Sequence, residues 1–315
     1  MDQQSIVITE EKVHPDAVAL LKDYRLIYTG ADFTQEELVA LVEQEQPVAI
    51  LARYGKFDEH VMAASKKLKV IGRHGVGMDA IDQEAARRLG VKAIAATGSN
   101  SQAVAELALG LILACARKIS WIDERMHAGH WDKQGYMGFE LSGAVLGVVG
   151  CGSIGGRVVR FAQAIGMQVI VCDPYLQADQ LPPGTAKVEL DELLAKSDVV
   201  SLHCPLDAST KGMLDARRLG LMRKGAILVN TARAGMFDER AMQERLQAGE
   251  LHLGLDCFVE EPLPSDSAWL GTPNSVLTPH IGGTTNGGLR GMAVGAAENI
   301  LSVLARARTA TTGGA

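Results

Sequence analysis

The sequence predicts an α/β protein with two domains, each built on a doubly wound parallel sheet. Three observations lead to this fold class. Short β-branched runs alternate with segments of helical spacing in both halves of the chain, which is typical of parallel strands covered by helices on both faces. A glycine turn between a strand and a helix opens the second half. An amphipathic helix ends the chain and can return to the first domain.

The first hundred residues predict four or five strands with helices between them. Thr34 is a plausible N-cap, and Glu37 stands three residues later at the capping-box spacing. The predicted strands cover 5–9, 25–30, 47–53, 68–75 and 91–97. The predicted helices cover 14–24, 34–44, 58–67 and 82–90.

A long helical stretch runs from Ser101 to about His127, and its Ala/Leu-rich first half suits burial against another helix or a subunit. An irregular, glycine-rich connection follows. The second set of strands then covers 145–150, 168–173, 199–204, 226–231, 251–258 and 275–280. The amphipathic helix over 289–308 ends the pattern. We therefore predict one domain from residues 1–100 plus 287–315, with a second domain of residues 101–286 inserted into it.

Composition narrows the function classes. Hydrophobic residues make up 47% of the chain, enough for a sizeable core, and the net charge of −6 comes with no run of Lys or Arg, which argues against a nucleic-acid surface. The N-terminus does not resemble a signal peptide, and the apolar run 107–116 is too short to span a bilayer. The five cysteines are scattered singly without CxxC spacing, so we expect reduced thiols, a cytoplasmic location, and neither a metal site nor a membrane partner.

The glycine turn GCGSIG predicts a dinucleotide site. Gly150 permits the tight turn, Gly152 lets the backbone approach a pyrophosphate, and Gly155 lets the helix lie close to the strand. The free N–H groups at the start of that helix favour phosphate. Asp173 ends the next strand, where a carboxylate accepts hydrogen bonds from a ribose diol and repels a 2′-phosphate. An ordinary βα turn is the alternative, but this context favours NAD over NADP.

Three polar residues follow successive strands in the second half: Arg233, Glu261 and His280. Ligands of open α/β sheets bind outside the carboxyl ends of the strands, so these residues are expected at one crevice. Reduction of a 2-keto acid places negative charge on the carbonyl oxygen. A protonated imidazole can donate a proton to that oxygen, a carboxylate keeps the imidazole charged, and a guanidinium binds the substrate carboxylate. Each residue alone is more often structural, but together they favour catalysis.

At this point the sequence resembles the D-isomer-specific 2-hydroxyacid dehydrogenase family, which includes phosphoglycerate, glycerate and D-lactate dehydrogenases. The resemblance runs from about residue 50 to about residue 305. The matching motifs, in chain order, are GRHGVGMDAID, NSQAVAELALGLIL, LGVVGCGSIG, LHCPLDAST, VNTARAG, GLDCFVEEP and LTPHIGG. Seven ordered motifs are far more specific than any single one.

The resemblance implies a flavodoxin-like substrate domain, completed by the C-terminal helix, and an inserted Rossmann NAD-binding domain, with the active site between them. It implies that Arg233 binds and polarises the substrate, that Glu261 rather than Glu260 partners the histidine, and that His280 is the acid/base. Asp256 would hold the nicotinamide carboxamide. The expected cofactor contacts are Gly150, Gly152, Ser153, Ile154, Gly155, Asp173, Pro205, Thr231, Ala232, Asp256, Gly282 and Gly283.

The substrate side is expected in the first domain. Backbone N–H groups around Val76 and Gly77 resemble the loop that holds the substrate carboxylate. Arg53 and Lys56 follow a strand and are either a solvated pair near acidic neighbours or the ligands of a second anion at the far end of the substrate. His74 could add a donor or simply pack. A second anion would suit 3-phosphoglycerate or a sulfolactate-like acid.

Several alternatives stay open. Hydroxypyruvate or glyoxylate would leave the Arg53 and Lys56 pair idle. The alternative from another functional class is a corepressor-like protein that senses NAD(H). A formate dehydrogenase is a further alternative, but the Glu261 and His280 pair argues against it, because hydride abstraction from formate needs no acid/base. The family pairs through the region of the long helix, so a homodimer is expected. No regulatory domain follows the last helix, so serine feedback is not expected. The sequence departs from the family pattern at three positions. Ala234 stands where the family often has glycine, and Asn286 and Gly287 stand where an acidic residue and an alanine are common.

Overall fold

The computed structural model describes residues 3–30 and 32–312 and confirms an α/β fold with two parallel sheets. The chain forms two compact units. Unit 1 comprises Met1–Asn100 and Gly283–Ala315, and unit 2 comprises Ser101–Gly282. The chain re-enters unit 1 at Gly283, whereas the predicted boundary was at residue 287.

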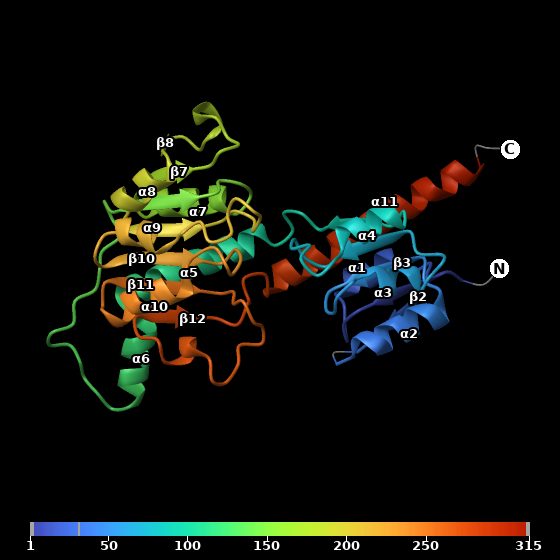
Figure 1. Ribbon diagram of the computed structural model, residues 1–315, viewed down its shortest axis with the longest axis horizontal. Coiled ribbons are helices and arrows are strands. Elements are labelled where there is room, and N and C mark those ends of the chain that lie inside the picture. Colours follow the sequence, from blue (N-terminus) through green and yellow to red (C-terminus); the bar gives the residue numbers. More distant parts are fainter. Residues whose placement is uncertain (1–2, 31, 313–315) are drawn as a thin grey trace. The chain divides into compact units, whose positions relative to one another are not determined.

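Unit 1 contains a five-stranded parallel sheet in the order β2-β1-β3-β4-β5. Figure 1 labels two of its strands, β2 and β3. Its strands are β1 (Ser5–Ile8), β2 (Arg25–Tyr28), β3 (Ala49–Ala52), β4 (Val70–Arg73) and β5 (Lys92–Ala95). Its helices are α1 (Pro15–Leu20), α2 (Gln35–Glu45), α3 (Glu59–Ala63), α4 (Gln83–Arg88) and α11 (Asn286–Thr312). Thr34 and Glu37 form the predicted capping box at the start of α2.

Helices cover both faces of this sheet. Successive side chains of a strand point to opposite faces, so each strand contributes to both cores. On β1, Ile6 and Ile8 join the core under α1 and α11, whereas Val7 joins the core under α2, α3 and α4. The helix α11 contacts β3, β4, β5 and α1. The C-terminal helix therefore completes unit 1 and packs against β3, β4 and β5.

Unit 2 contains a seven-stranded parallel sheet in the order β12-β11-β10-β9-β6-β7-β8. Its strands are β6 (Val145–Val149), β7 (Gln168–Cys172), β8 (Thr185–Lys187), β9 (Val199–Leu202), β10 (Ala226–Asn230), β11 (Leu251–Leu255) and β12 (Ser275–Leu277). Its helices are α5 (Ser101–Arg117), α6 (Ile119–His127), α7 (Gly155–Ala164), η1 (Ala178–Gln180), α8 (Leu190–Lys196), α9 (Ala216–Leu221), α10 (Glu239–Gln247) and η2 (Ala268–Gly271).

The strand order of unit 2 reverses at β6. From β6 the chain winds outward through β7 and β8, and then returns to β9 on the other side of β6. The loops that follow β6 and β9 therefore diverge, and this is the point where such sheets bind ligands. Helices α5 and α7 cover one face of the sheet, while α8, α9 and α10 cover the other.

The long predicted helix is interrupted. Lys118 takes a left-handed backbone with φ of 49°, which ends α5 and begins α6. The Ala/Leu-rich half of α5 is buried inside unit 2, where Ala105, Ala108 and Leu111 pack in the core. The apolar surface of this half is thus used within its own chain. The short edge strand β8 was not predicted, because its partly exposed residues carry no hydrophobic pattern.

We predict that Gly72→Ala on β4 destabilises unit 1. A Cβ at this position would lie 2.7 Å from the Ala296 carbonyl oxygen and 2.8 Å from Ile300 Cγ1, both on α11. Overpacking of this kind costs about 1–3 kcal/mol in the free energy of unfolding, measurable by urea denaturation.

The matched control is Gly220→Ala on α9, where the described part of the chain places no atom within 4 Å of a new Cβ. This change should be neutral or stabilise by up to about 1 kcal/mol. Equal midpoints for the wild type and Gly72→Ala would contradict the packing of α11 on β4.

Candidate active site

The carboxyl ends of the strands in unit 2 share one edge of the sheet because all its strands are parallel. Most of the predicted residues of unit 2 come directly after the strand ends or a few residues beyond them. Gly150 follows β6, Asp173 follows β7, Thr231 follows β10, Asp256 follows β11, and His280 lies beyond β12. Pro205 lies beyond β9 and Ala232 follows Thr231. The sheet thus collects the cofactor and catalytic candidates of unit 2 at one edge.

Two glycines of the turn, Gly150 and Gly155, are required by close contacts within the chain. Gly150 has φ of 86°, and a Cβ there would lie 2.8 Å from the Cys204 amide nitrogen. A Cβ on Gly155 would lie 2.0 Å from the Gly150 carbonyl oxygen, so only glycine lets α7 begin there. Around Gly152 the described residues leave open space. Ser153 and Ile154 complete the turn into α7, whose first N–H groups are available to a phosphate.

Asp173 is held in place beside this turn. Its carboxylate is buried and accepts hydrogen bonds from the backbone N–H groups of Cys151 at 2.9 Å, Tyr175 at 2.9 Å and Leu176 at 3.2 Å. These bonds tie the end of β7 to the glycine turn after β6. A carboxylate fixed beside the glycine turn is compatible with an adenosine ribose.

The structure brings Glu261 and His280 together. The His280 Nδ1 and Glu261 Oε2 atoms lie 2.7 Å apart, and Glu261 Oε1 accepts a hydrogen bond of 2.9 Å from the Phe258 N–H. The carboxylate is therefore fixed by its own loop and oriented toward the imidazole. Both side chains remain substantially exposed, 49% for His280 and 37% for Glu261, so the imidazole is accessible to a substrate.

The backbone of His280 has an unusual conformation, and hydrogen bonds to Asp256 hold the loop around it. His280 has φ of 53°, a value that residues other than glycine rarely adopt. Asp256 is 1% exposed and accepts bonds from the Thr278 hydroxyl at 2.6 Å, the Ile281 N–H at 2.9 Å and the Gly282 N–H at 2.8 Å. The sequence did not predict that Asp256 supports this loop. The groups that donate to Asp256 are two backbone N–H groups and the Thr278 hydroxyl, and no sequence pattern marks them.

A second buried residue, Asn230, holds the loop of Arg233. The Asn230 amide donates to the Arg233 carbonyl at 2.7 Å and accepts from the Ala232 N–H at 3.0 Å. Sequence reasoning missed Asn230, although it directly precedes TARAG. The left-handed position of this turn falls on Gly235, with φ of 78°, so the departure at Ala234 is accommodated.

Two further groups complete this region. Burial raises the pKa of the Cys257 thiol to about 12, so it stays neutral beside Arg233 and Glu261. The hydroxyl of Thr231 is buried, and no hydrogen-bond partner for it exists among the residues that the structure describes. An orphaned hydroxyl at a predicted cofactor contact, together with the glycine turn and Asp173, fits a dinucleotide.

The two predicted glycine contacts after His280 divide between the units. Gly282 belongs to unit 2, where its N–H binds Asp256 and a Cβ would lie 3.0 Å from that carboxylate. Gly283 belongs to unit 1, where a Cβ would lie 2.9 Å from Asn100 Nδ2. Both positions are tight, which explains why glycine stands there.

In unit 1 the loop over Val76 and Gly77 follows β4. Neither the Val76 N–H nor the Gly77 N–H has a backbone partner within the described chain, while Arg73 Nε donates to the Gly77 carbonyl at 3.0 Å. Gly75 takes φ of 137°, which turns the chain into the loop. Exposed amide groups on a loop fixed by an arginine suit a carboxylate.

The two cationic candidates of unit 1 differ. Arg53 does not pair with its acidic sequence neighbours: its Nη1 donates to Glu10 Oε2 at 2.7 Å. Asp58 instead caps α3, and Glu59 pairs with Arg88. Lys56 is exposed. The alternative of a solvated pair near the acidic neighbours is therefore wrong for Arg53.

His74 is buried, which favours the packing alternative over the alternative of a substrate donor. Its side chain is 2% exposed, and desolvation, followed by the nearby Arg53 charge, lowers its pKa to about 4. It is neutral at physiological pH and packs inside unit 1.

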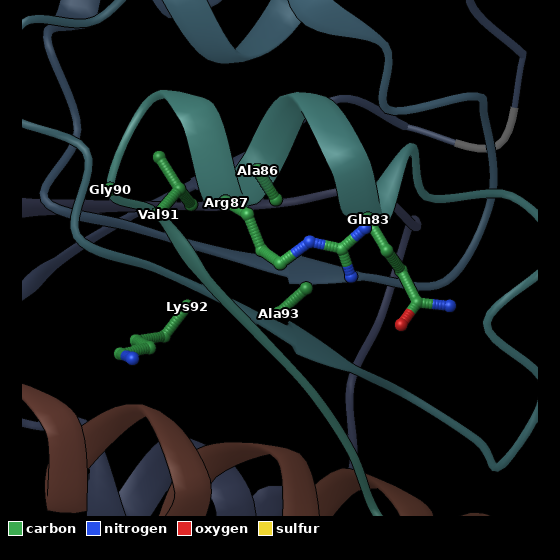
Figure 2. Close-up of a pocket in the computed structure, with 7 residues that line it drawn as sticks. All are labelled: Gln83, Ala86, Arg87, Gly90, Val91, Lys92 and Ala93. Carbon is green, nitrogen blue, oxygen red and sulfur yellow. The ribbon is translucent and has the colours of Figure 1, made fainter.

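A surface pocket of unit 1 lies between α4 and β5 (Figure 2). Its lining holds no predicted site residue; it comprises Gln83, Ala86, Arg87, Gly90, Val91, Lys92 and Ala93. Within the described ranges, no cluster of His, Cys, Asp and Glu could hold a metal ion, and no helix is long and apolar enough to cross a membrane.

Known proteins resemble this chain in sequence and fold. Residues 109–282 match the family described as D-isomer specific 2-hydroxyacid dehydrogenase, NAD binding domain. A D-3-phosphoglycerate dehydrogenase of Methanocaldococcus jannaschii is 36% identical over 95% of this chain, but the match spans only 57% of that relative. A hydroxypyruvate reductase of Thermotoga maritima is 37% identical, with 90% of this chain and 93% of the relative covered.

A crystal structure of the TT0316 protein from Thermus thermophilus superimposes with a TM-score of 0.87 at 36% identity, covering 95% of this chain and 96% of that one. The family match exceeds half of the chain, and the relatives extend it over nearly all the rest. The chain belongs to the D-isomer specific 2-hydroxyacid dehydrogenase family, and unit 2 carries its NAD-binding domain.

Proposed function

We propose that this chain interconverts a D-2-hydroxy acid and its 2-keto acid with NAD(H), using His280 as the acid/base. The observation that carries the proposal is the 2.7 Å contact between His280 Nδ1 and Glu261 Oε2. This contact leaves the second ring nitrogen, Nε2, to exchange a proton with a substrate oxygen. The family to which the chain belongs supports the same chemistry.

In the direction of reduction, bound NADH supplies the hydride. His280 donates the proton from Nε2 to the keto oxygen as negative charge develops there, and Glu261 stabilises the charged imidazole before the transfer. Arg233 binds the substrate carboxylate and polarises the carbonyl. In unit 1, the Val76 and Gly77 N–H groups are the proposed donors to a substrate carboxylate. In the direction of oxidation, neutral His280 accepts the hydroxyl proton.

The cofactor is held by the backbone of the glycine turn, with the pyrophosphate at the start of α7 and the adenosine ribose at Asp173. A 2′-phosphate would meet the Asp173 carboxylate, whose negative charge opposes it. This repulsion supports a preference for NAD over NADP.

The substrate is a small 2-hydroxy acid, and Arg53 is assigned to its far end. The names of the relatives offer two choices, 3-phosphoglycerate and hydroxypyruvate. A partly exposed guanidinium, 23% accessible and fixed by Glu10, favours an acid with a second anionic group. Reduction of hydroxypyruvate or glyoxylate remains the second candidate, because Arg53 is already paired. The five cysteines are free thiols, which supports a cytoplasmic setting.

The proposed homodimer uses α6 and the connection after it, rather than the buried half of α5. No residue of α6 is buried, and Trp121 is 50% exposed. On the connection, Trp131 is 76% and Met137 81% exposed. Arg125 lies over the Trp121 ring and binds Asp132, so the connection is tied to α6. Exposed aromatic side chains on an ordered surface are typical of an interface.

We predict that His280→Ala lowers kcat for reduction of hydroxypyruvate or glyoxylate by roughly 10²–10⁴, as for loss of a general acid.

Glu261→Gln should move the upper pH limit of reduction downward, because the protonated imidazole loses its stabilising charge. The pH profile of kcat/KM with NADH measures this limit, and Glu260→Gln is the matched control that should leave it in place. An unmoved limit in Glu261→Gln would refute the pairing.

We predict that Asp173→Ala weakens NADH binding and improves the use of NADPH relative to NADH. The removed charge no longer repels a 2′-phosphate, and the ribose loses its acceptor. The ratio of kcat/KM for the two cofactors is the readout. The assignment fails if this ratio is the same in the variant and the wild type.

We predict a dimer by light scattering at micromolar concentration. Trp131→Glu should dissociate it, since a buried unpaired charge opposes association. Leu270→Glu, at a site 59% exposed on η2, is the control and should stay dimeric. A wild-type monomer would contradict the proposed interface.

A further inference from the structure

Three polar side chains meet inside unit 1 where β1, β3 and β4 end. They are Glu10, Arg53 and His74, and their strands are neighbours in the sheet. Glu10 is 3% exposed, so its carboxylate is removed from water. Its Oε2 binds Arg53 Nη1 at 2.7 Å, while its Oε1 has no hydrogen-bond partner among the described residues and lies 3.8 Å from His74 Nε2.

The pairing with Glu10 fixes Arg53 and offsets its charge. The Arg53 guanidinium also lies over the Tyr54 ring, with Cζ 5.1 Å from the ring centroid. The Arg53 N–H is bound to the Thr9 hydroxyl at 2.9 Å, which holds its backbone. One edge and one face of the guanidinium are therefore occupied. The remaining donors of Arg53 can bind a ligand, but they belong to a pair with no net charge.

The other nearby groups contribute less than Arg53 to binding a far-end anion. His74 is neutral, because burial lowers its pKa to about 4. The guanidinium of Arg73 keeps its positive charge, but its Nε and Nη1 donors are engaged by the backbone carbonyls of Ala52, Arg53 and Gly77. Lys56 is exposed, and water screens its charge.

We propose that Glu10 makes this a subsite for a far-end group with a single negative charge, a sulfonate or a carboxylate, and that it disfavours a phosphate dianion. The inference rests on the proposed function, in which Arg53 contacts the far end of the substrate. Arg53 attracts the first negative charge of the ligand. A second charge gains no further hydrogen-bonding cation and is repelled by the Glu10 carboxylate, whose Oε1 accepts no hydrogen bond from the described residues.

The buried setting makes this repulsion effective, since charges in a protein interior are screened less than charges in water. A phosphate monoester has a second pKa of about 6 and is mostly a dianion at neutral pH, whereas a sulfonate keeps one charge. The two groups are similar in shape. A comparison between them therefore measures charge selectivity rather than size.

The test compares kcat/KM with NADH for sulfopyruvate, oxaloacetate and phosphohydroxypyruvate. Each value is divided by that for glyoxylate, which has no far-end group, so general damage to the site cancels. At about pH 8, where the phosphate is a dianion, we expect the wild type to favour sulfopyruvate over phosphohydroxypyruvate by about tenfold or more. Oxaloacetate distinguishes a carboxylate from a sulfonate. A wild-type preference for the phosphorylated substrate would overturn the inference.

Two Glu10 variants isolate the charge. Glu10→Gln keeps the shape and removes the charge, and should raise the phosphate-to-sulfonate ratio about tenfold. Glu10→Asp keeps the charge and should leave the ratio near that of the wild type. An unchanged ratio in Glu10→Gln overturns the inference.

The wild type alone supplies a second readout. From about pH 8 to about pH 5.5 the phosphate gains a proton while the sulfonate does not, so the phosphate-to-sulfonate ratio should rise. The titratable and charged groups that face Glu10 are Arg53, His74 and Tyr28. Burial lowers the pKa of His74 to about 4 and raises the pKa of Tyr28, so neither changes charge over this range. Burial also raises the pKa of Glu10, and its protonation at low pH would move the ratio in the same direction. A flat ratio would also overturn the inference, even if the Glu10 variants do not fold.

Arg53→Ala separates this inference from the proposed function. If Arg53→Ala lowers the normalised values for all three far-end substrates but Glu10→Gln changes no ratio, only the charge filter is wrong. If Arg53→Ala changes none of them, the far-end assignment of Arg53 in the proposed function is wrong, and the filter falls with it. Absence of turnover with every keto acid would overturn both.

Discussion

The parallel direction of the strands is the constraint on which this protein depends. Every strand in each sheet ends at the same edge, so a residue just past a strand meets the residues past its neighbours. In unit 2 this edge collects the glycine turn, Asp173, Arg233 and His280. In unit 1 it collects Glu10, Arg53 and the loop that begins at Gly75. The chemistry of this chain lies at its strand ends, while the helices supply the cores beneath them.

Three candidates, His280, Arg233 and Arg53, are held by buried polar residues at or near strand ends. Asp256 supports the left-handed turn at His280, and Asn230 closes the loop of Arg233. Glu10 fixes Arg53 in the same way. Such partners are expensive to bury unless their hydrogen bonds are made, and making them fixes the geometry of the residue they hold. The same bonds thus serve the stability of the loops and the precision of the site.

The sequence predicted the parts of this arrangement that follow from periodicity and strand order. Alternating strands and helices indicated the two sheets, and the glycine spacing with Asp173 indicated the cofactor edge. Glu261 and His280 could be paired because both follow strands and are of complementary chemistry. Glu10 was missed because its partner Arg53 lies at the end of another strand. Asn230 was missed although its partners Ala232 and Arg233 are close in sequence, because no periodicity marks a polar side chain at a strand end. The break at Lys118 was missed for a similar reason, since neither Gly nor Pro stands there.

The central claim is that the edge of unit 2 built around His280 and Glu261 reduces a 2-keto acid with NADH to one enantiomer. Chiral analysis of the hydroxy acid formed from hydroxypyruvate and NADH tests this claim most directly. Membership of the D-isomer specific family predicts the D-isomer alone. Formation of the L-isomer or of a racemate would contradict the account.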